Sequence, residues 1–87
     1  METKPIADLH NHTTASDGDF SPDELVKSAK DLKLQALAVT DHDTTNGVKS
    51  AIEAGSRYNI DVIPGVEVSI RFKQTDFVGT LHLLCYF

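Results

Sequence analysis

The sequence has little cysteine, no long apolar run and no basic amino-terminal segment. Its 87 residues include one cysteine, Cys85, so no disulfide can form within the chain, and a reducing compartment is the expected environment. No apolar run approaches the ~20 residues that a membrane span needs. The Met1-Glu2-Thr3-Lys4 start lacks the basic and apolar parts of a signal peptide. We therefore expect a soluble cytoplasmic protein.

Basic residues are also scarce. Thirteen Asp and Glu residues against eight Lys and Arg residues give a net charge of -5. This balance argues against a surface that holds long duplex nucleic acid by neutralising its phosphates. Small anionic substrates remain compatible with it if metal ions supply local positive charge. A chain of this length forms one small domain at most and buries only about two-thirds of the surface of its unfolded form.

Short apolar runs alternate with helical periodicity along the chain, which is typical of βα units in an α/β fold. The expected order is β-α-β-α-β-β. The expected elements are a strand at 6–9, a helix at 22–33, a strand at 34–39 and a helix at 47–58. A third strand follows at 60–63, is broken by Pro64-Gly65 and continues half-exposed at 66–72, and the last strand is at 81–87.

Both helices have start signals. Ser21 predicts an N-cap, Pro22 the first helical position and Glu24 the second half of a capping box, while Thr45 or Asn46 is expected to cap the second helix. The side chains expected to pack inward are Leu25, Val26, Ala29 and Leu32 in the first helix and Val48, Ala51, Ile52 and Ala54 in the second.

Histidines and carboxylates are concentrated where predicted strands end, which is where open α/β sheets and (β/α) barrels place their sites. In the segment His10-Asn11-His12 the two imidazoles lie on one side of an extended chain, so both can reach one metal ion. The Asp17-Gly18 turn can fold a carboxylate back toward them. Asp41-His42-Asp43 follows the second strand, and either aspartate could bind a metal, orient a histidine or touch substrate.

Two further residues complete this set. Glu67 follows Pro64-Gly65, where one carboxylate could bridge two ions, and His82 lies between two leucines on the last strand. Taken alone, each has an ordinary structural reading. His82 could be a core or edge histidine, Glu67 an exposed strand residue, Asp17 part of a simple turn and Asp43 a helix cap. Four separate segments that each deliver a metal-type ligand to a strand end favour a shared site instead.

Imidazole nitrogen with carboxylate oxygen and without thiolate suits manganese, zinc, iron or magnesium. Two or three such ions could clamp a phosphate, convert bound water to hydroxide and stabilise the leaving oxygen. The sequence therefore predicts metal-dependent hydrolysis of a phosphoester through a metal-bound hydroxide.

Four ordered motifs of the chain resemble those of the PHP (polymerase and histidinol phosphatase) family. They are Asp8-Leu9-His10-Asn11-His12 with the following residues to Gly18, Ala38-Val39-Thr40-Asp41-His42-Asp43 with the following residues to Gly47, Ile63-Pro64-Gly65-Val66-Glu67-Val68-Ser69, and Leu81-His82-Leu83-Leu84-Cys85-Tyr86-Phe87. The chain is most similar to the subgroup of bacterial phosphoesterases that act on small nucleotides, which includes nucleoside 3',5'-bisphosphate phosphatases and 5'-3' exoribonucleases of short RNA.

This resemblance implies that residues 1–87 are the N-terminal part of a PHP domain, an incomplete piece of a distorted (β/α)7 TIM-like barrel. By position, His10, His12 and Glu67 would hold one ion, Glu67 and His82 a second, and Asp17 and His42 a third. The resemblance also implies catalytic roles for Asp17, His42 and Glu67, a substrate contact for Asp43, and a small phosphorylated nucleotide as substrate.

The chain departs from the family pattern in two ways. Lys33 stands where a glycine often precedes the second strand, which affects the local backbone and not the chemistry. Family ligands contributed by later strands have no counterpart here, so we expect weak or no hydrolysis by these 87 residues alone. Two alternatives differ in class: a non-catalytic metal-binding module that self-associates through uncovered strand edges, and the PHP domain of a DNA polymerase, for which the acidic chain offers no support.

Overall fold

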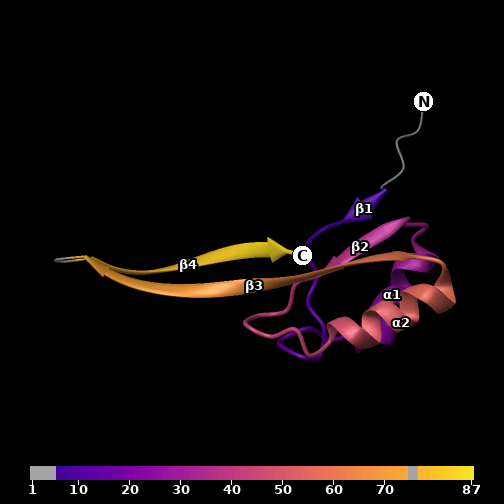
Figure 1. Cartoon of the computed structure of the whole chain (residues 1–87), viewed down its shortest axis with the longest axis horizontal. Coiled ribbons are helices and arrows are strands. Elements are labelled where there is room, and N and C mark those ends of the chain that lie inside the picture. The colour runs from indigo at the N-terminus through magenta and orange to yellow at the C-terminus, as the bar shows by residue number, and fades with distance from the viewer. Residues whose placement is uncertain (1–5, 75–76) are drawn as a thin grey trace.

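The computed structural model describes residues 6–74 and 77–87 and contains the expected order of elements. These are β1 (Ala7–Asp8), α1 (Pro22–Asp31), β2 (Ala36–Val39), α2 (Val48–Tyr58), β3 (Asp61–Gln74) and β4 (Phe77–Tyr86). The strands form one sheet in the order β1-β2-β3-β4 (Figure 1). The β1–β2 and β2–β3 pairs are parallel, whereas β3 and β4 form an antiparallel hairpin. The β-α-β-α-β-β prediction is confirmed.

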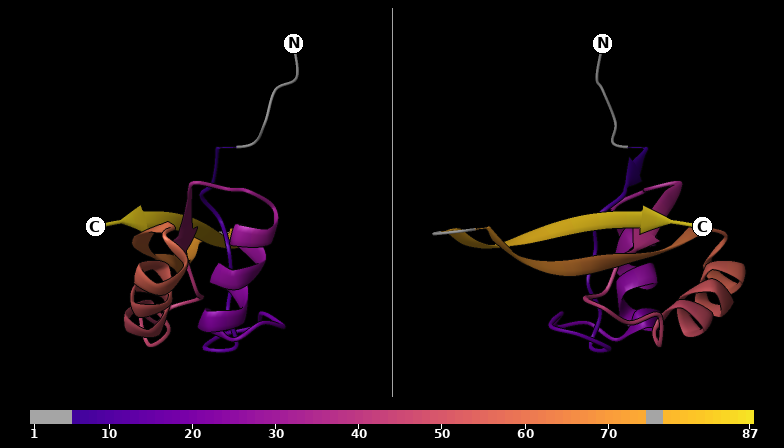
Figure 2. Two further views of the ribbon diagram at one scale, coloured as in Figure 1. Left: turned by 90° about the vertical axis from the view of Figure 1, so that its right-hand side faces the viewer. Right: turned by 60° about the vertical axis from the view of Figure 1, so that its left-hand side comes forward.

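The two helices lie side by side on the same side of the sheet (Figure 2). Their small inward residues let them approach β2 and β3 closely. The buried core cluster consists of Val26, Ala29, Leu37, Val39, Ala51, Ala54 and Ile60. The inward faces predicted for the helices were wrong at one residue each, because Leu32 is 66% exposed and Ile52 is 43% exposed. Leu32 is the C-cap of α1, so the helix has already ended where its periodicity would have turned that side chain inward.

The start of α1 agrees with the prediction. Ser21 accepts a hydrogen bond from the Glu24 N–H, and the Glu24 carboxylate accepts one from the Ser21 N–H, which completes the capping box. The cap predicted for α2 was wrong. Gly47 is the N-cap and makes no side-chain hydrogen bond, and it lies in a crowded position where a Cβ would be 2.8 Å from Thr13 Oγ1.

The end of α1 explains the position of Lys33. Leu34 N–H donates to the Ala29 carbonyl and Lys33 N–H to the Lys30 carbonyl, both at 3.0 Å, which is the Schellman arrangement. Lys33 adopts a φ of 62°, in the left-handed region that glycine occupies without steric cost. The helix therefore stops at Asp31, two residues earlier than its periodicity predicts.

The predicted break at Pro64-Gly65 was also wrong, since β3 continues through it. Residues 61–64 pair with β2, and residues 65–74 pair with β4. Pro64 and Gly65 thus mark the point where β3 changes its partner. Pro64 has no N–H, but its carbonyl accepts from Phe87 N–H at 3.0 Å. Gly65 allows the close approach of β4, because a Cβ there would be 2.9 Å from the Cys85 carbonyl oxygen.

The hairpin extends away from the helices, which cover only the end of β3 that pairs with β2 (Figure 1). Several large apolar side chains near the C-terminus are accordingly 38–67% exposed: Leu81, Leu83, Leu84, Tyr86 and Phe87. Within the described part of the chain, no helix is long and apolar enough to cross a membrane.

Candidate metal centre

The carboxylate of Glu67 lies at the centre of a cluster of all four histidines. Its Oε1 atom is 2.7 Å from His10 Nε2 and 2.9 Å from His12 Nε2. Its Oε2 atom is 3.2 Å from His82 Nδ1 and 3.6 Å from His42 Nδ1. Glu67 is only 7% exposed. One buried carboxylate therefore links side chains from three other segments of the chain.

Backbone hydrogen bonds hold Glu67 beside the segment that follows β2. Glu67 N–H donates to the Asp41 carbonyl at 3.0 Å, and Asp43 N–H donates to the Glu67 carbonyl at 2.9 Å. These two bonds form a parallel bridge between His42 and Glu67, beyond the end of β2 itself. His82 reaches the same carboxylate from β4, where it pairs with Ser69. The partner change in β3 is what places Glu67 between the two neighbours.

The segment after β1 is held to the segment after β2 through Asn11. Thr40 N–H donates to the Asn11 carbonyl at 2.8 Å, and the Asn11 side-chain amide donates to the Asp8 and Ala38 carbonyls, each at 3.1 Å. Because these hydrogen bonds hold Asn11 against β2, the neighbouring side chains of His10 and His12 are both directed toward Glu67. The sequence placed the two imidazoles on one side of the chain but gave no sign of this role for Asn11.

The Asp17-Gly18 turn brings a second carboxylate into the cluster, as expected. Asp17 Oδ1 is 2.8 Å from His12 Nδ1, and Asp17 Oδ2 is 3.2 Å from His42 Nε2. The turn is closed by the Thr13 carbonyl, which accepts from Ser16 N–H at 3.1 Å and from Gly18 N–H at 2.9 Å. All six residues predicted as ligands therefore come together in one place.

These residues form three overlapping groups whose nitrogen and oxygen atoms lie within 4.8 Å of one another. The groups are His10, His12 and Glu67; His12, Asp17 and His42; and His42, Glu67 and His82. Paired atoms are 2.7–3.6 Å apart, within the span of two ligands that share an ion at roughly 2.0–2.2 Å each. The donors are imidazole and carboxylate throughout, which suits divalent transition ions. The side chains present thus fit a metal site.

The overlap of the groups limits how many ions they can hold at once. His12 and His42 each belong to two groups, and a neutral imidazole binds one ion through one nitrogen. If His12 joins His10 and Glu67, His42 can join either Asp17 or the pair of Glu67 and His82. The family resemblance implies the first choice, with Asp17 and His42 at one ion and Glu67 and His82 at another.

The electrostatics of Glu67 reflect the histidines around it. Burial alone would raise the pKa of Glu67, but hydrogen bonds from His10 and His12 and electrostatic interaction with His42 and His10 outweigh burial. The pKa of Glu67 therefore lies below its ordinary value of 4.5. Near neutral pH the centre of the cluster is a carboxylate, the form that binds cations.

The two aspartates that flank His42 differ in their surroundings. Asp43 is exposed, has a φ of 52° and accepts a hydrogen bond from Ser69 N–H at 2.9 Å through Oδ1. Its substrate contact stays a prediction. Asp41 is 1% exposed and accepts hydrogen bonds from Thr13 and Ser16, and it belongs to none of the three groups. Thr13 and Ser16 are therefore members of the site that sequence reasoning missed.

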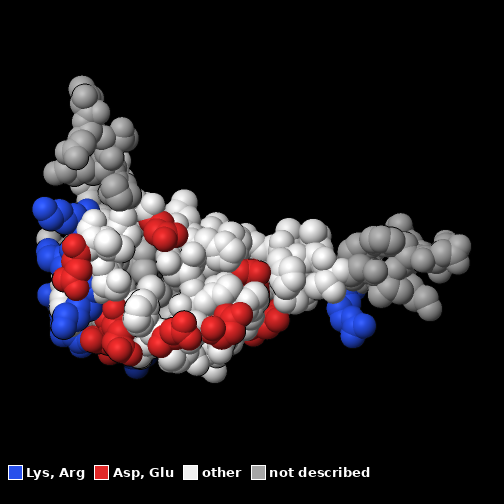
Figure 3. Space-filling view, turned by 180° about the vertical axis from the view of Figure 1, so that it is seen from behind, with Lys and Arg blue, Asp and Glu red and all other residues white. Residues whose placement is uncertain are grey.

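On the face shown in Figure 3, Lys and Arg side chains gather mainly at the end of the body away from the hairpin, and a row of Asp and Glu runs along one edge.

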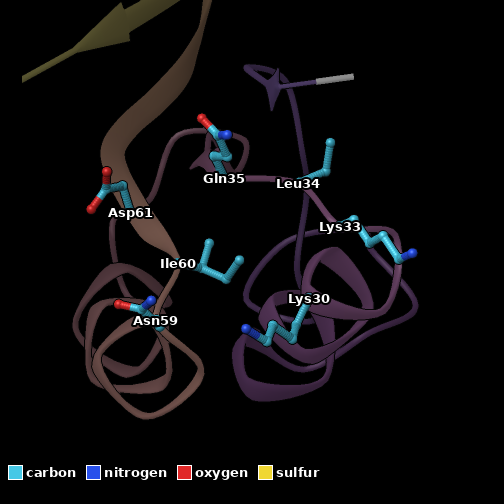
Figure 4. A pocket seen from close by; sticks show the side chains of 7 residues that line it. All are labelled: Lys30, Lys33, Leu34, Gln35, Asn59, Ile60 and Asp61. Carbon is cyan, nitrogen blue, oxygen red and sulfur yellow. The ribbon is translucent and has the colours of Figure 1, made fainter. Parts of the chain in front are cut away.

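A hollow of about 630 Å³ lies between the C-terminal ends of the two helices (Figure 4). Gln35 and Asp61 line it, and they lie at the amino ends of β2 and β3, opposite the histidines. The histidine cluster is thus separate from this hollow.

The chain is similar to known proteins over nearly its whole length. The profile of the family described as PHP domain matches residues 8–86. The chain belongs to the PHP family. The matched residues include all six predicted ligands and every strand of the described sheet except the first residue of β1.

Several PHP relatives are similar over most of this chain. The 5'-3' exoribonuclease Rnm of Escherichia coli is 50% identical over an alignment of 91 positions that covers 94% of this chain and 31% of the relative. The 3',5'-nucleoside bisphosphate phosphatase of Chromobacterium violaceum is 43% identical over 77 residues, covering 88% and 26%. The chain thus spans less than a third of the length of these curated relatives.

The fold of a solved PHP relative is also similar. A protein from Bifidobacterium adolescentis, described as a metal-dependent phosphoesterase, superposes with a TM-score of 0.82 at 34% identity. The match covers 94% of this chain and 27% of that one. The mixed α/β sheet described above is therefore a part of the TIM-like PHP fold, as predicted.

Proposed function

We propose that this chain supplies the metal-binding face of a metal-dependent phosphoesterase that hydrolyses small phosphorylated nucleotides or short oligonucleotides. The observation that carries the proposal is the convergence of four histidines on Glu67, with Asp17 bridging His12 and His42. The names of the exoribonuclease and bisphosphate phosphatase relatives support the choice of substrate.

In this proposal His10, His12, Asp17, His42, Glu67 and His82 bind divalent ions. Ions bound there would supply positive charge to a phosphoryl oxygen and would lower the pKa of a bound water, chemistry that requires no covalent enzyme intermediate. The side chains of this chain fix the ligand atoms in place before an ion arrives. Asp43 lies directly after His42 and is the proposed contact to substrate.

The number of ions is also part of the proposal. His10, His12 and Glu67 provide three ligands from this chain, which is the usual complement of protein ligands at a catalytic zinc site. The Asp17–His42 and Glu67–His82 pairs provide two ligands each, so ions at these positions bind more weakly. We therefore propose one firmly held ion, of manganese, zinc or iron, and hydrolysis that is weak in the 87-residue chain.

Among the strands of the described residues β4 lies at the edge of the sheet, and its exposed apolar side chains support self-association as a second proposal. The free Cys85 thiol is compatible with the cytoplasm. Light scattering after size exclusion tests the first of these. A dimer or larger species supports self-association, and a strictly monomeric chain argues against it.

The test of the metal site is to count ions in the purified chain after loading with Zn²⁺ or Mn²⁺ and dialysis. We expect about one ion per chain in the wild type and a loss of binding in Glu67→Gln, because glutamine keeps the shape of the side chain but not its charge. Asp19→Asn removes an exposed carboxylate from the neighbouring loop and serves as the matched control. Equal ion contents in wild type and Glu67→Gln would refute the proposed site. Release of phosphate from adenosine 3',5'-bisphosphate, measured on the same samples, tests the reaction itself.

A further inference from the structure

The carboxylate of Asp41 accepts three hydrogen bonds, and none of the donors belongs to a proposed metal ligand. Asp41 Oδ1 accepts from Thr13 N–H at 2.6 Å and from the Ser16 hydroxyl at 2.7 Å, and Oδ2 accepts from the Thr13 hydroxyl at 2.8 Å. Asp41 is 1% exposed and Thr13 is fully buried. A buried carboxylate with three donors is a strongly fixed group, because moving any donor would leave charge without compensation.

The donors belong to the segment 13–18, which carries one proposed ligand and directly follows another. Thr13 comes next after His12, and Asp17 lies within the turn. Thr13 is also where the turn's own hydrogen bonds converge. Its carbonyl accepts from Ser16 and Gly18 N–H groups, and its hydroxyl oxygen accepts from Ala15 N–H at 3.0 Å. Fixing Thr13 therefore fixes both the backbone after His12 and the turn that presents Asp17.

Asp41 is in turn fixed to the other half of the cluster. Its carbonyl accepts from Glu67 N–H at 3.0 Å, and it directly precedes His42. Gly47 closes the remaining space, since a Cβ there would be 3.1 Å from Asp41 Oδ2. Asp41 thus connects the segment of His12 and Asp17, through its side chain, to the segment of His42 and Glu67, through its backbone.

We propose that Asp41 is a positioning residue of the metal centre: its side chain sets the separation of His12 and Asp17 from His42 and Glu67, and so the affinity for the ions. This inference rests on the proposed metal-binding function. Asp41 does not itself bind an ion in this proposal. A group that orients ligands in this way commonly contributes about 10- to 100-fold to metal affinity.

The first experiment compares Asp41→Asn with wild type in a Zn²⁺ titration followed by NMR of the histidine side chains. Asparagine has the same shape, but its single acceptor oxygen can satisfy at most two of the three donors. We expect Zn²⁺ binding reported by His12 and His42 to weaken about 10- to 100-fold. Binding reported by His82, which lies on β4 outside the segment that Asp41 holds, should change less. Equal weakening at all three histidines, or none, would overturn the inference.

The second experiment needs no metal. Amide hydrogen exchange of Ser16 and Gly18 should become about tenfold faster in Asp41→Asn, while the amides of β2 keep their protection. Ser16→Ala removes the hydroxyl that donates to Asp41 at 2.7 Å and lies 3.5 Å from Asp17 Oδ1, and it should give a smaller change of the same kind. Ser16→Thr, which keeps the hydroxyl, should behave as wild type. If Asp41→Asn does not fold, the two Ser16 variants alone test whether the Asp41 carboxylate holds segment 13–18 in place.

The two experiments separate the two proposals. A wild-type chain that binds no Zn²⁺ would refute the proposed metal-binding function and with it the effect of Asp41 on affinity. Unchanged exchange in segment 13–18 of the Asp41 and Ser16→Ala variants would refute the positioning role alone, even if Zn²⁺ binds normally.

Discussion

The sharpest test of the turn that presents Asp17 is the substitution Gly18→Ala. A Cβ at Gly18 would overlap the His12 carbonyl oxygen and lie 2.5 Å from the His12 carbonyl carbon and 2.8 Å from Thr13 N. Ordinary contacts of a Cβ begin at 3.4 Å, so the contact with the His12 carbonyl carbon alone requires the turn to open by at least about 0.9 Å. Gly18 has no positive φ, so the predicted loss of stability comes from this contact and not from backbone conformation.

The displacement has two measurable consequences. Asp17 oxygens now lie 2.8 and 3.2 Å from His12 and His42, so a shift of that size moves them beyond hydrogen-bond distance. Overpacking of this kind costs roughly 1–3 kcal/mol, which corresponds to a fall in the thermal midpoint of about 5–20 °C for a domain of this size. The assays are thermal unfolding by circular dichroism and the Zn²⁺ titration reported by His42.

The matched control is Asp19→Ala, which changes the next, exposed residue and adds no atom to the turn. It should leave the thermal midpoint within about 2 °C of wild type. If Gly18→Ala also keeps the wild-type midpoint and the wild-type Zn²⁺ affinity, then the close approach of the turn to the His12–Thr13 peptide does not hold Asp17, and the reasoning fails.

Three further changes test the scaffold, each followed by chemical or thermal denaturation. Ser21→Ala should destabilise the chain by about 1 kcal/mol because it removes the N-cap of α1. Hydrogen bonds from the Ser21 N–H and then the Ser21 hydroxyl hold the pKa of Glu24 below its ordinary value of 4.5, so the stability that the Glu24 carboxylate contributes is present above pH 4.5 and should be lost as pH falls through the lower folded pKa. A Glu24→Gln penalty that does not shrink below that pH would contradict this. Lys33→Gly should stabilise by up to about 1 kcal/mol, since glycine adopts the left-handed φ of 62° without steric cost, and a lower midpoint would argue against that strain. Leu37→Ala should cost about 2–5 kcal/mol, because Leu37 is 1% exposed at the centre of β2, and a loss under 1 kcal/mol would mean that this core is not tightly packed.

Acidic side chains have different roles in this chain according to their burial. Glu67 and Asp41 are both nearly buried, yet Glu67 faces four imidazoles and Asp41 faces three hydrogen-bond donors of one turn. The first arrangement leaves a negatively charged centre for cations, and the second uses the charge to hold the backbone. Part of the net charge of -5 is thus explained by the site and not by solubility alone.

The sequence by itself determined those features that depend on near neighbours in the chain. The capping box of Ser21 and Glu24 closes within one helical turn, and the order of strands and helices follows from the local periodicity of apolar residues. The His10-Asn11-His12 spacing placed two imidazoles on one side of an extended segment for the same local reason. The motifs also indicated the PHP family, because the segments that carry the ligand residues follow one another along the chain in the order of the family's motifs.

Only the tertiary structure decided which of these groups meet. Pro64-Gly65 resembles a break in a strand, but β3 continues through it because β2 pairs on one side before that point and β4 on the other side after it. Leu32 and Ile52 have the periodicity of inward residues, but the end of α1 and the position of α2 leave them exposed. Asp41 could have been a ligand, an orienting group or a substrate contact by sequence alone. Its burial beside Thr13, 28 residues away, is the basis for the proposed orienting role, and hydrogen bonds between such distant segments depend on packing that no local pattern encodes.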